Sequence, residues 1–246
     1  YRADVLDTIG SEILARCAEL ADLLAREEGK ALPDARGEVV RAGHIFKFFA
    51  GEALRVGGEL LASTRPGMSV GITREPVGVV GIITPWNFPL AIPAWKIAPA
   101  LAMGNTVVVR PAGQDPLAVI ELVKLLNDVG FPAGVVNVVT GSTPATGEAL
   151  IASPDVDMVS FTGSTGVGMR IGEVAGRTMK RQLLELGGKG GALVLDDADP
   201  KTAIGMISSV WAFHSGQICT APTRAIVHRS IYEQVVEGLA AAAGRL

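Results

Sequence analysis

Cys219 is the residue of this sequence with the clearest capacity for covalent chemistry. It lies in a glycine-led segment, GQICTAPTR (216–224), that is expected to follow a helix. A cysteine in such a loop can be an exposed nucleophile, because backbone N–H groups can stabilise a thiolate. The alternative is a buried structural thiol. Spacing alone leaves both open, since His214 is near in sequence but is not thereby placed near in space.

Glu185 is a second candidate, flanked by leucines and followed by two glycines in LELGGK (184–189). A carboxylate in partly apolar surroundings takes up a proton more readily than one in water, which suits a general base. The alternative is a glutamate at the end of a strand that pairs with Lys189 or Lys180. The sequence does not decide between the two.

Asn87 lies in the segment TPWNFP (84–89), after an apolar run that predicts a strand. The two prolines restrict the loop and can therefore hold the asparagine amide in one direction. A fixed amide NH2 can donate to an oxyanion. The alternative is an asparagine that forms a turn beside a packed Trp86.

A glycine- and serine-rich turn, FTGSTGVG (161–168), follows another predicted strand and opens a helix. Its backbone N–H groups and the Ser164 hydroxyl could bind a phosphate at the helix N-terminus. It is not the G-x-G-x-x-G fingerprint of dinucleotide-binding proteins. The alternative is an ordinary turn between a strand and a helix.

Alternating strands and helices must position these residues. Helical spacing of apolar residues predicts helices within residues 3–28 and 35–53. Beyond them, β-branched runs predict strands at residues 77–83, 106–110, 135–139, 158–161, 192–195 and 224–227. Helices are predicted between them at residues 90–103, 116–129, 145–151, 167–174 and 200–213, with a further helix at the end. This pattern favours an α/β fold with an open, parallel, Rossmann-like sheet covered by helices on both faces, which binds nucleotides at the carboxyl ends of its strands.

Composition excludes several classes of protein. The chain of 246 residues is 48% hydrophobic and 19% charged, which excludes a disordered charged tail. The net charge is −3, without a dense run of Lys and Arg, so we expect no nucleic-acid and no membrane partner. Two cysteines give no disulfide framework, and no metal-ligand cluster or apolar run of membrane-spanning length occurs. These features favour a soluble cytoplasmic protein without a metal.

Taken together, the four segments and a fifth resemble one family in their residues and order. TPWNFP, GNTVVVRP (104–111), SFTGSTGVG, LELGGK and GQICTAPTR are similar to the NAD(P)-dependent aldehyde dehydrogenase superfamily. LELGGK and the GQ-x-C-T pattern are highly specific to it. The resemblance covers essentially the whole chain.

The resemblance implies a role for each candidate. Cys219 would attack the aldehyde carbonyl and form a thiohemiacetal, while the Asn87 amide and the Cys219 backbone N–H hold the oxyanion. Hydride transfer would then leave a thioester, and Glu185 would activate the water that hydrolyses it to the carboxylate. Such a base argues against a relative that passes its acyl group to CoA.

The resemblance also implies cofactor contacts for NAD or NADP. The pyrophosphate would lie over the glycine-rich turn, at Gly163, Ser164 and Gly168. Ile83, Pro85 and Trp86 resemble the loop that lines the cofactor in this family. Leu186 and Gly187 resemble the family's stretch beside the nicotinamide.

Cofactor preference depends on two departures from the family pattern. The family usually has a lysine where this chain has Arg110, and NAD-preferring members often have a glutamate where it has Gly113. A carboxylate there would repel the 2′-phosphate of NADP, whereas Arg110 could attract it. We therefore expect NADP to be accepted.

The stretches AGHIFKFFAGEALR (42–55) and IPAWKIAPALAMGNTVVV (92–109) are further similar to enzymes that oxidise 2-oxoglutarate semialdehyde, also called 2,5-dioxopentanoate. Succinate semialdehyde and aromatic aldehydes are the competing substrates. The resemblance thus points to a small semialdehyde.

By this resemblance, residues 1–187 form the cofactor-binding domain and residues 188–246 the start of a catalytic domain that carries the nucleophile. Residues 58–76 resemble the first part of an oligomerisation arm, which implies a homodimer or homotetramer at full length. The chain begins without methionine and stops within a predicted helix, so we expect it to be truncated at both ends.

Two other functions remain as alternatives. One is a truncated nucleotide-binding chain that cannot turn over, for which a buried, unreactive Cys219 would be the sign. The other is an ordinary Rossmann alcohol dehydrogenase, which is disfavoured because the sequence lacks the G-x-G-x-x-G turn, a Tyr-x-x-x-Lys pair and a metal-ligand set.

Overall fold

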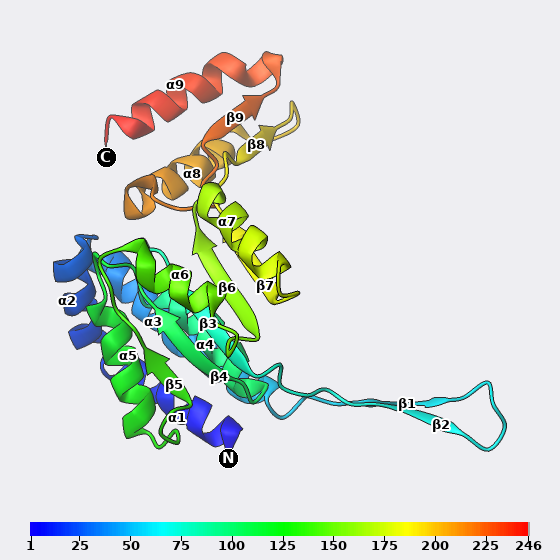
Figure 1. Ribbon diagram of the computed structural model, residues 1–246. Coiled ribbons are helices and arrows are strands. Elements are labelled where there is room, and N and C mark those ends of the chain that lie inside the picture. Colours follow the sequence, from blue (N-terminus) through cyan, green and yellow to red (C-terminus); the bar gives the residue numbers. More distant parts are fainter. Residues whose placement is uncertain (246) are drawn as a thin grey trace. The chain divides into compact units, whose positions relative to one another are not determined.

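The computed structural model describes residues 1–245 (Figure 1), and Leu246, the last residue of the expected second domain, lies outside the described residues. Contacts within the chain divide it into two compact units, residues 1–185 and 186–246. We call them unit 1 and unit 2.

Unit 1 begins with three helices, α1 (Arg2–Ala15), α2 (Cys17–Glu28) and α3 (Leu32–Glu52). The helical stretch expected at residues 3–28 therefore contains two helices, interrupted at Arg16 with φ −92° and ψ 20°. The apolar stripe continues across this break, with Ile13 and Leu20 both buried, so periodicity does not reveal it. Cys17 packs against the core, as its place in the stripe predicts.

A five-stranded sheet forms the centre of unit 1. Its strands are β3 (Val79–Ile83), β4 (Thr106–Arg110), β5 (Val136–Val138), β6 (Met158–Gly163) and β7 (Arg181–Leu186). Their order is β5-β4-β3-β6-β7, and β3 pairs in parallel with both β4 and β6. This confirms the predicted open parallel sheet. Of these five strands, β7, which carries the LELGGK glutamate, is the one that the β-branched runs did not predict.

Helices cover both faces of this sheet (Figure 1). On one face α4 (Ala91–Ala102) packs against β3 and β4, and α5 (Leu117–Asp128) against β5, with α1, α2 and α3 outside them. On the other face α6 (Pro144–Ala152) contacts β3 and α7 (Thr165–Gly176) contacts β6. The predicted fold class is thus confirmed.

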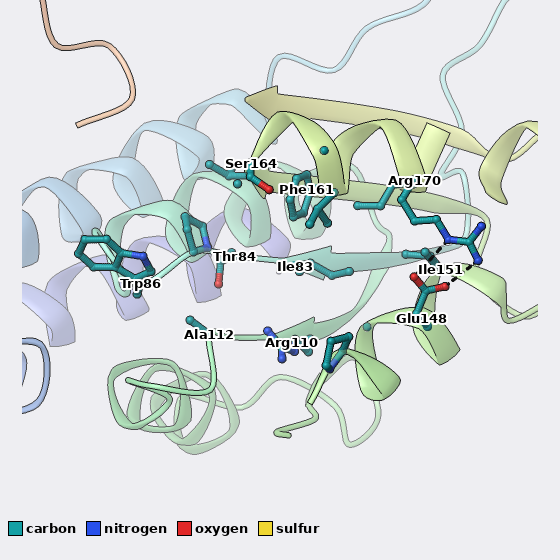
Figure 2. A pocket seen from close by; sticks show the side chains of 18 of the residues that line it. Ile83, Thr84, Trp86, Arg110, Ala112, Glu148, Ile151, Phe161, Ser164 and Arg170 are labelled. Atoms are coloured by element: carbon teal, nitrogen blue, oxygen red, sulfur yellow. Dashed lines mark hydrogen bonds and ion pairs between the residues drawn. The ribbon is translucent and has the colours of Figure 1, made fainter. Parts of the chain in front are cut away.

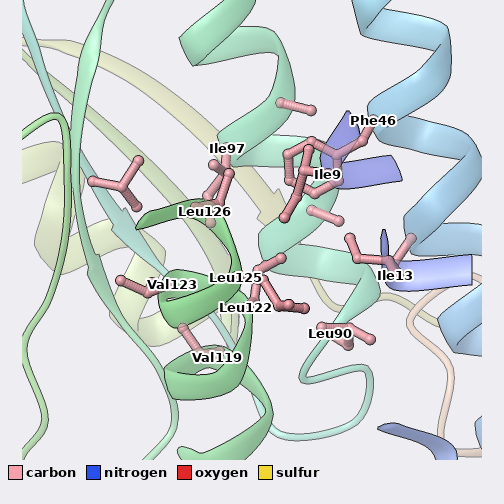
Figure 3. Packing of buried hydrophobic residues seen from close by; sticks show 14 of the residues in the cluster. Ile9, Ile13, Phe46, Leu90, Ile97, Val119, Leu122, Val123, Leu125 and Leu126 are labelled. Carbon is pink, nitrogen blue, oxygen red and sulfur yellow. The ribbon is translucent and has the colours of Figure 1, made fainter. Parts of the chain in front are cut away.

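The main hydrophobic core lies between the sheet and the helices of the first face. Figure 3 shows Phe46 and Ile9 beside Ile97 of α4, and Leu122 and Leu126 of α5 nearby. Phe46 and Leu126 are fully buried. Because α4 packs into this core, the end of the loop that leads into α4 is rigidly supported.

An antiparallel hairpin, β1 (Glu59–Ala62) and β2 (Ser69–Ile72), projects from the rest of unit 1 (Figure 1). Every residue of its two strands is exposed, including Leu60 and Val70. It coincides with the stretch that resembles an oligomerisation arm.

Unit 2 is a smaller α/β unit. Its strands β8 (Gly191–Val194) and β9 (Arg224–Val227) are parallel, and its helices α8 (Pro200–Ala212) and α9 (Tyr232–Ala243) pack on each other. Asp199 caps α8, since its side chain accepts the Thr202 backbone N–H at 3.0 Å. Two short turns, η1 (Phe213–Gly216) and η2 (Arg229–Ile231), precede β9 and α9.

Residues 1–245 contain neither a helix able to span a membrane nor a cluster of metal-ligating side chains. No helix there has the length and apolar character needed to cross a membrane. Over the same part of the chain, no group of three or more His, Cys, Asp and Glu side chains could hold a metal ion.

Candidate active site

The strand order creates a natural binding site in unit 1. From β3 the chain adds β4 and β5 on one side, and then returns to add β6 and β7 on the other. In open parallel sheets a crevice forms outside the carboxyl ends of the strands where the order reverses. Here that point is between Ile83, the last residue of β3, and Gly163, the last residue of β6.

A cavity of about 530 Å³ lies at this point (Figure 2). Its volume is in the range of sites for small molecules and cofactors. Six of the predicted cofactor residues line it: Ile83, Pro85, Trp86, Arg110, Gly163 and Ser164. Trp86 lies at one end of the cavity and the Glu148–Arg170 pair at the other (Figure 2).

The amino terminus of α7 opens onto this cavity. Ser164 is the N-cap residue, and Gly166 and Val167 of the first turn are lining residues. The first turn contains no acidic side chain, so the N–H groups and the positive end of the helix are available to an anion. The Thr84 hydroxyl is a further lining group that is buried without a hydrogen-bond partner.

Arg110, at the end of β4, contributes a positive charge to the cavity. Its Nη2 donates to the carbonyl oxygens of Gly141, at 3.1 Å, and Thr143, at 3.4 Å. Its Nε is buried without a partner, and neither of these contacts neutralises the guanidinium. An anionic ligand group could therefore pair with it.

Gly113 does not line the cavity, although it belongs to the same loop. A Cβ atom at this position would lie 3.0 Å from the carbonyl oxygen of Gly141, which is closer than ordinary packing. The backbone here thus favours glycine. A glutamate at residue 113 would require the loop at Gly141 to shift.

The sequence did not reveal the ion pair at the far end of the cavity. The Arg170 guanidinium of α7 donates to the Glu148 carboxylate of α6 at 3.2 and 3.3 Å, and also to Glu173 at 3.1 Å. These contacts connect the two helices that flank the cavity. No motif signals them, because Glu148 and Arg170 are 22 residues apart.

Glu185, the predicted base, is held by two side chains that the sequence did not single out. The Thr162 hydroxyl donates to Oε2 at 2.8 Å, and the Lys96 ammonium lies 3.7 Å from the same oxygen. The carboxylate side chain is 41% exposed, whereas that of Lys96 is buried. Lys96 also donates to the Ser160 hydroxyl at 3.0 Å.

Burial lowers the pKa of Lys96, and the neighbouring Glu185 carboxylate opposes that shift. The alternative pairing of Glu185 with Lys180 is wrong. The Lys180 ammonium instead donates to the backbone carbonyls of Ile151 and Ser153, at 3.0 and 2.7 Å.

Asn87 lies in the loop between β3 and α4, half-buried, and is not among the residues that line the cavity. Its backbone carbonyl accepts a hydrogen bond from Lys30 at 2.8 Å. The neighbouring Trp86 is exposed and lines the cavity.

Cys219 lies in unit 2, in the loop between α8 and β9, and is exposed. His214, Ser215 and Gly216 just before it adopt positive φ angles of 48°, 53° and 73°. Such backbone strain in non-glycine residues gathers at functional sites. The Trp211 indole anchors the loop, because its Nε1 donates to the Pro222 carbonyl at 3.1 Å.

The structure therefore gathers part of the predicted site. Thr162 and Gly163 belong to β6 and line the cavity, and the Thr162 hydroxyl also donates to the Glu185 carboxylate. The predicted cofactor residues outside the cavity lining are Gly113, Gly168, Leu186 and Gly187. Gly168 is buried within α7. Leu186 and Gly187 are the first two residues of unit 2, the unit that contains Cys219.

Comparison with known proteins identifies the relatives of this chain. The sequence profile of the aldehyde dehydrogenase family matches residues 1–246. An alpha-ketoglutarate semialdehyde dehydrogenase of Haloferax volcanii is 45% identical over 238 residues, which cover 97% of this chain and 49% of the relative. An NADP+ succinate-semialdehyde dehydrogenase of Schizosaccharomyces pombe is 43% identical, over 92% of this chain and 45% of the relative.

The fold is also similar to a solved structure. The crystal structure of an NAD-dependent aldehyde dehydrogenase from Sinorhizobium meliloti superposes with a TM-score of 0.97 at 39% identity. The match covers 100% of this chain and 49% of that protein. The chain spans about half the length of the curated relatives it matches.

Proposed function

Because the chain belongs to the aldehyde dehydrogenase family, we propose that it serves the oxidation of an aldehyde to its carboxylate with NAD+ or NADP+. The observation that carries this proposal is the cavity at the carboxyl ends of β3 and β6. It combines an uncapped helix N-terminus, an arginine without a carboxylate partner and an apolar wall, as a dinucleotide requires.

The residues present fit this cofactor. The first turn of α7, with Gly163 and Ser164, would hold the pyrophosphate, and the buried Thr84 hydroxyl offers another hydrogen bond. Arg110 would bind near the adenosine ribose, where its charge suits the 2′-phosphate of NADP. When bound, the cofactor supplies a nicotinamide ring that accepts a hydride.

The chain's own residues supply covalent and acid–base chemistry. The Cys219 thiolate would add to the aldehyde carbon, and the Asn87 amide with the Cys219 backbone N–H would stabilise the alkoxide. Loss of the aldehyde hydrogen as hydride turns this adduct into a thioester. Water then displaces the thiol, and the products are the carboxylate and free Cys219.

Glu185 would accept the proton of that water. Thr162 and Lys96 both contact Oε2, so Oε1 remains the oxygen that can face the water. The two contacts orient the carboxylate while leaving it partly exposed. Orientation of a general base within hydrogen-bond reach of its proton is the first requirement of such catalysis.

The substrate we propose is a small semialdehyde, with 2-oxoglutarate semialdehyde first and succinate semialdehyde second. The support is the likeness of residues 42–55 and 92–109 to enzymes of this kind, together with the semialdehydes for which the two relatives are named. A panel of both semialdehydes, betaine aldehyde and phenylacetaldehyde, each with NAD+ and NADP+, would rank them by kcat/KM.

We also propose that the β1–β2 hairpin mediates self-association. Both of its strand edges and the side chains of Leu60, Leu61 and Val70 are exposed, and such an edge favours pairing with another strand. Light scattering after gel filtration tests this. A Leu60→Lys variant is expected to shift the protein toward a smaller oligomer, and an unchanged mass would contradict the proposal.

Formation of reduced cofactor, followed at 340 nm, tests the activity itself. The proposal predicts turnover with a semialdehyde that Cys219→Ala abolishes. The alternative, nucleotide binding without turnover, is not favoured by the family assignment. It predicts a measurable cofactor Kd and no aldehyde oxidation by the unmodified protein.

A further inference from the structure

A buried ion pair in unit 1 takes no part in the chemistry described so far. Lys30 follows Gly29, which ends α2 in a left-handed conformation with φ 89°, and this turn directs the chain inward. Glu38 lies in the second turn of the next helix, α3. Both side chains are fully buried, and Lys30 Nζ lies 2.5 Å from Glu38 Oε2.

Glu38 uses its other oxygen to hold the start of α4. Oε1 accepts the backbone N–H groups of Leu90 and Ala91, at 2.8 and 2.9 Å. Leu90 is the N-cap residue of α4 and has no side chain able to cap the helix. The Glu38 carboxylate, which belongs to α3, therefore caps the N-terminus of α4 in place of a local side chain.

Lys30 holds the residues just before this point. Its ammonium donates to the Asn87 carbonyl at 2.8 Å and lies 4.4 Å from the centre of the Phe88 ring. At the other end of the loop, the Thr84 N–H donates to the Arg110 carbonyl at 3.2 Å. The segment from Thr84 to Leu90 is thus fixed at both ends.

We propose that Lys30 and Glu38 are positioning residues that fix the direction of the Asn87 amide. The inference rests on the proposed role of Asn87 as an oxyanion donor. Such a donor must be held within about 0.5 Å of its productive place. Two prolines limit the loop's own conformations, but they lack an N–H group and therefore donate no hydrogen bond that could anchor it to the helices. The ion pair supplies that anchor.

The chemistry of the pair explains why it is charged. A buried ion pair does not in itself stabilise a folded protein more than apolar residues of equal volume would. Apolar residues here would leave the N–H groups of Leu90 and Ala91 and the Asn87 carbonyl without these partners. The carboxylate accepts from both N–H groups and from the ammonium, and the ammonium donates to the Asn87 carbonyl, so the pair satisfies all three groups.

The test compares two variants that differ only in the side chain at residue 30. Glu38→Gln retains an oxygen for Leu90 and Ala91 and leaves the Lys30 ammonium with the Asn87 carbonyl and the buried Glu28 carboxylate, 3.7 Å away. Lys30→Met combined with Glu38→Gln keeps that oxygen and removes the contacts of Lys30 to Asn87, Phe88 and Glu28. Lys47→Met is the control, because the Lys47 ammonium of α3 donates to Asp7 and Ser11, on the partly exposed side of its helix.

The readouts are the first-turnover rate of reduced cofactor formation and the Kd of NAD+. We expect the double variant to lower the rate by about 10- to 100-fold relative to Glu38→Gln, with Kd changed less than about twofold. A rate equal to that of Glu38→Gln would overturn the proposal, and so would a parallel loss of NAD+ binding.

A double-mutant cycle separates positioning from general loss of structure. In the background of Asn87→Ala, the Lys30 and Glu38 changes are expected to lower the rate by less than about twofold more, because the group they position is already gone. Independent, multiplicative effects would contradict the inference.

Amide hydrogen exchange distinguishes failure of this inference from failure of the proposed function. If Asn87→Ala leaves the first-turnover rate unchanged, the oxyanion role of Asn87 is wrong. Amide exchange at residues 86–91 is expected to be about tenfold faster in the double variant than in Glu38→Gln. Equal exchange rates would contradict the inference that the Lys30 contact anchors the loop. Should Lys30→Met not fold, Lys30→Gln in the same background gives the same comparison.

Discussion

Units 1 and 2 differ in how they hold the residues assigned to catalysis. Nine buried polar or charged residues occur in the part of the chain that the structure describes, and eight of them lie in unit 1. Among these, Lys30 contacts the Asn87 carbonyl, Glu38 the backbone N–H of Leu90, and Lys96 the Glu185 carboxylate. In unit 2 the only member is His214, and the core consists of four buried residues with partly buried neighbours.

The two halves of the proposed mechanism therefore have different kinds of support. Asn87 and Glu185, the proposed oxyanion donor and base, contact charges buried in a large core and are held by long-range packing. Cys219, the proposed nucleophile, follows a strained backbone turn at residues 214–216 in a loop with one anchor from Trp211. Substitutions in the two units should therefore have different signatures.

Glu185→Gln is expected to have the largest effect and to separate the base from the nucleophile. Steady-state turnover should fall by about 10²- to 10⁴-fold, because the thioester loses its general base. A burst of reduced cofactor, equal to the active sites, should remain. Rapid-mixing absorbance at 340 nm measures both. Loss of the burst as well would show that Glu185 acts before the thioester forms.

Phe46→Ala tests whether the core of unit 1 carries the stability of the site. Removal of this fully buried ring is expected to lower the free energy of unfolding by about 3–5 kcal/mol. Phe48→Ala, on the same helix but exposed, should change it by less than about 1 kcal/mol. Urea denaturation compares the two, and equal losses would contradict the assignment of the core.

Arg110→Gln is expected to act on cofactor choice alone. The Kd of NADP+ should rise by about 10- to 100-fold, as one charge-assisted contact to the 2′-phosphate is lost, and that of NAD+ much less. Isothermal titration measures both. In the unmodified protein, a Kd for NADP+ far above that for NAD+ would contradict the prediction that NADP is accepted.

Asp115→Asn is expected to act through the pH dependence of stability. Burial, with repulsion from Glu27, Glu28 and Glu38, raises the pKa of Asp115 to about 8 from 3.8. The native state therefore holds a proton that the unfolded state releases between these values, and stability falls as pH rises through this window, by up to about 1.4 kcal/mol per pH unit.

The Asn variant lacks this loss, so its advantage over the unmodified protein should grow from pH 5 to pH 8. Glu28, whose pKa is also raised by burial, leaves a residual slope in both proteins. Denaturation curves at several pH values measure the difference. A constant difference across this range would show that Asp115 is ionised in the folded protein at pH 5.

Local patterns predicted most of the fold. The strand over residues 106–110 and the strand over 224–227 begin and end where β-branched runs predict them, since these signals lie within a few residues. The break at Arg16 and the strand β7 were not predicted. An apolar stripe does not register a one-residue interruption, and RQLLEL alternates too little to distinguish strand from helix.

The site was predictable only where its residues belong to a segment. The lining residues Ile83, Trp86, Gly163 and Ser164 come from two motifs at the ends of strands. The partners of Asn87 and Glu185 were not predictable, because Lys30 is 57 residues from Asn87 and Lys96 is 89 residues from Glu185 along the chain. Folding brings these groups together, and no spacing rule encodes such a distance.

Peptide mass spectrometry of the Glu185→Gln variant shows whether Cys219 carries the acyl group. The variant is mixed with 2-oxoglutarate semialdehyde and NAD+, stopped in acid and digested. We expect the mass of one acyl group on Cys219, in proportion to the burst of reduced cofactor, with Cys17 unmodified. Reduced cofactor formed without an adduct on Cys219, or an adduct on Cys17 instead, would contradict it.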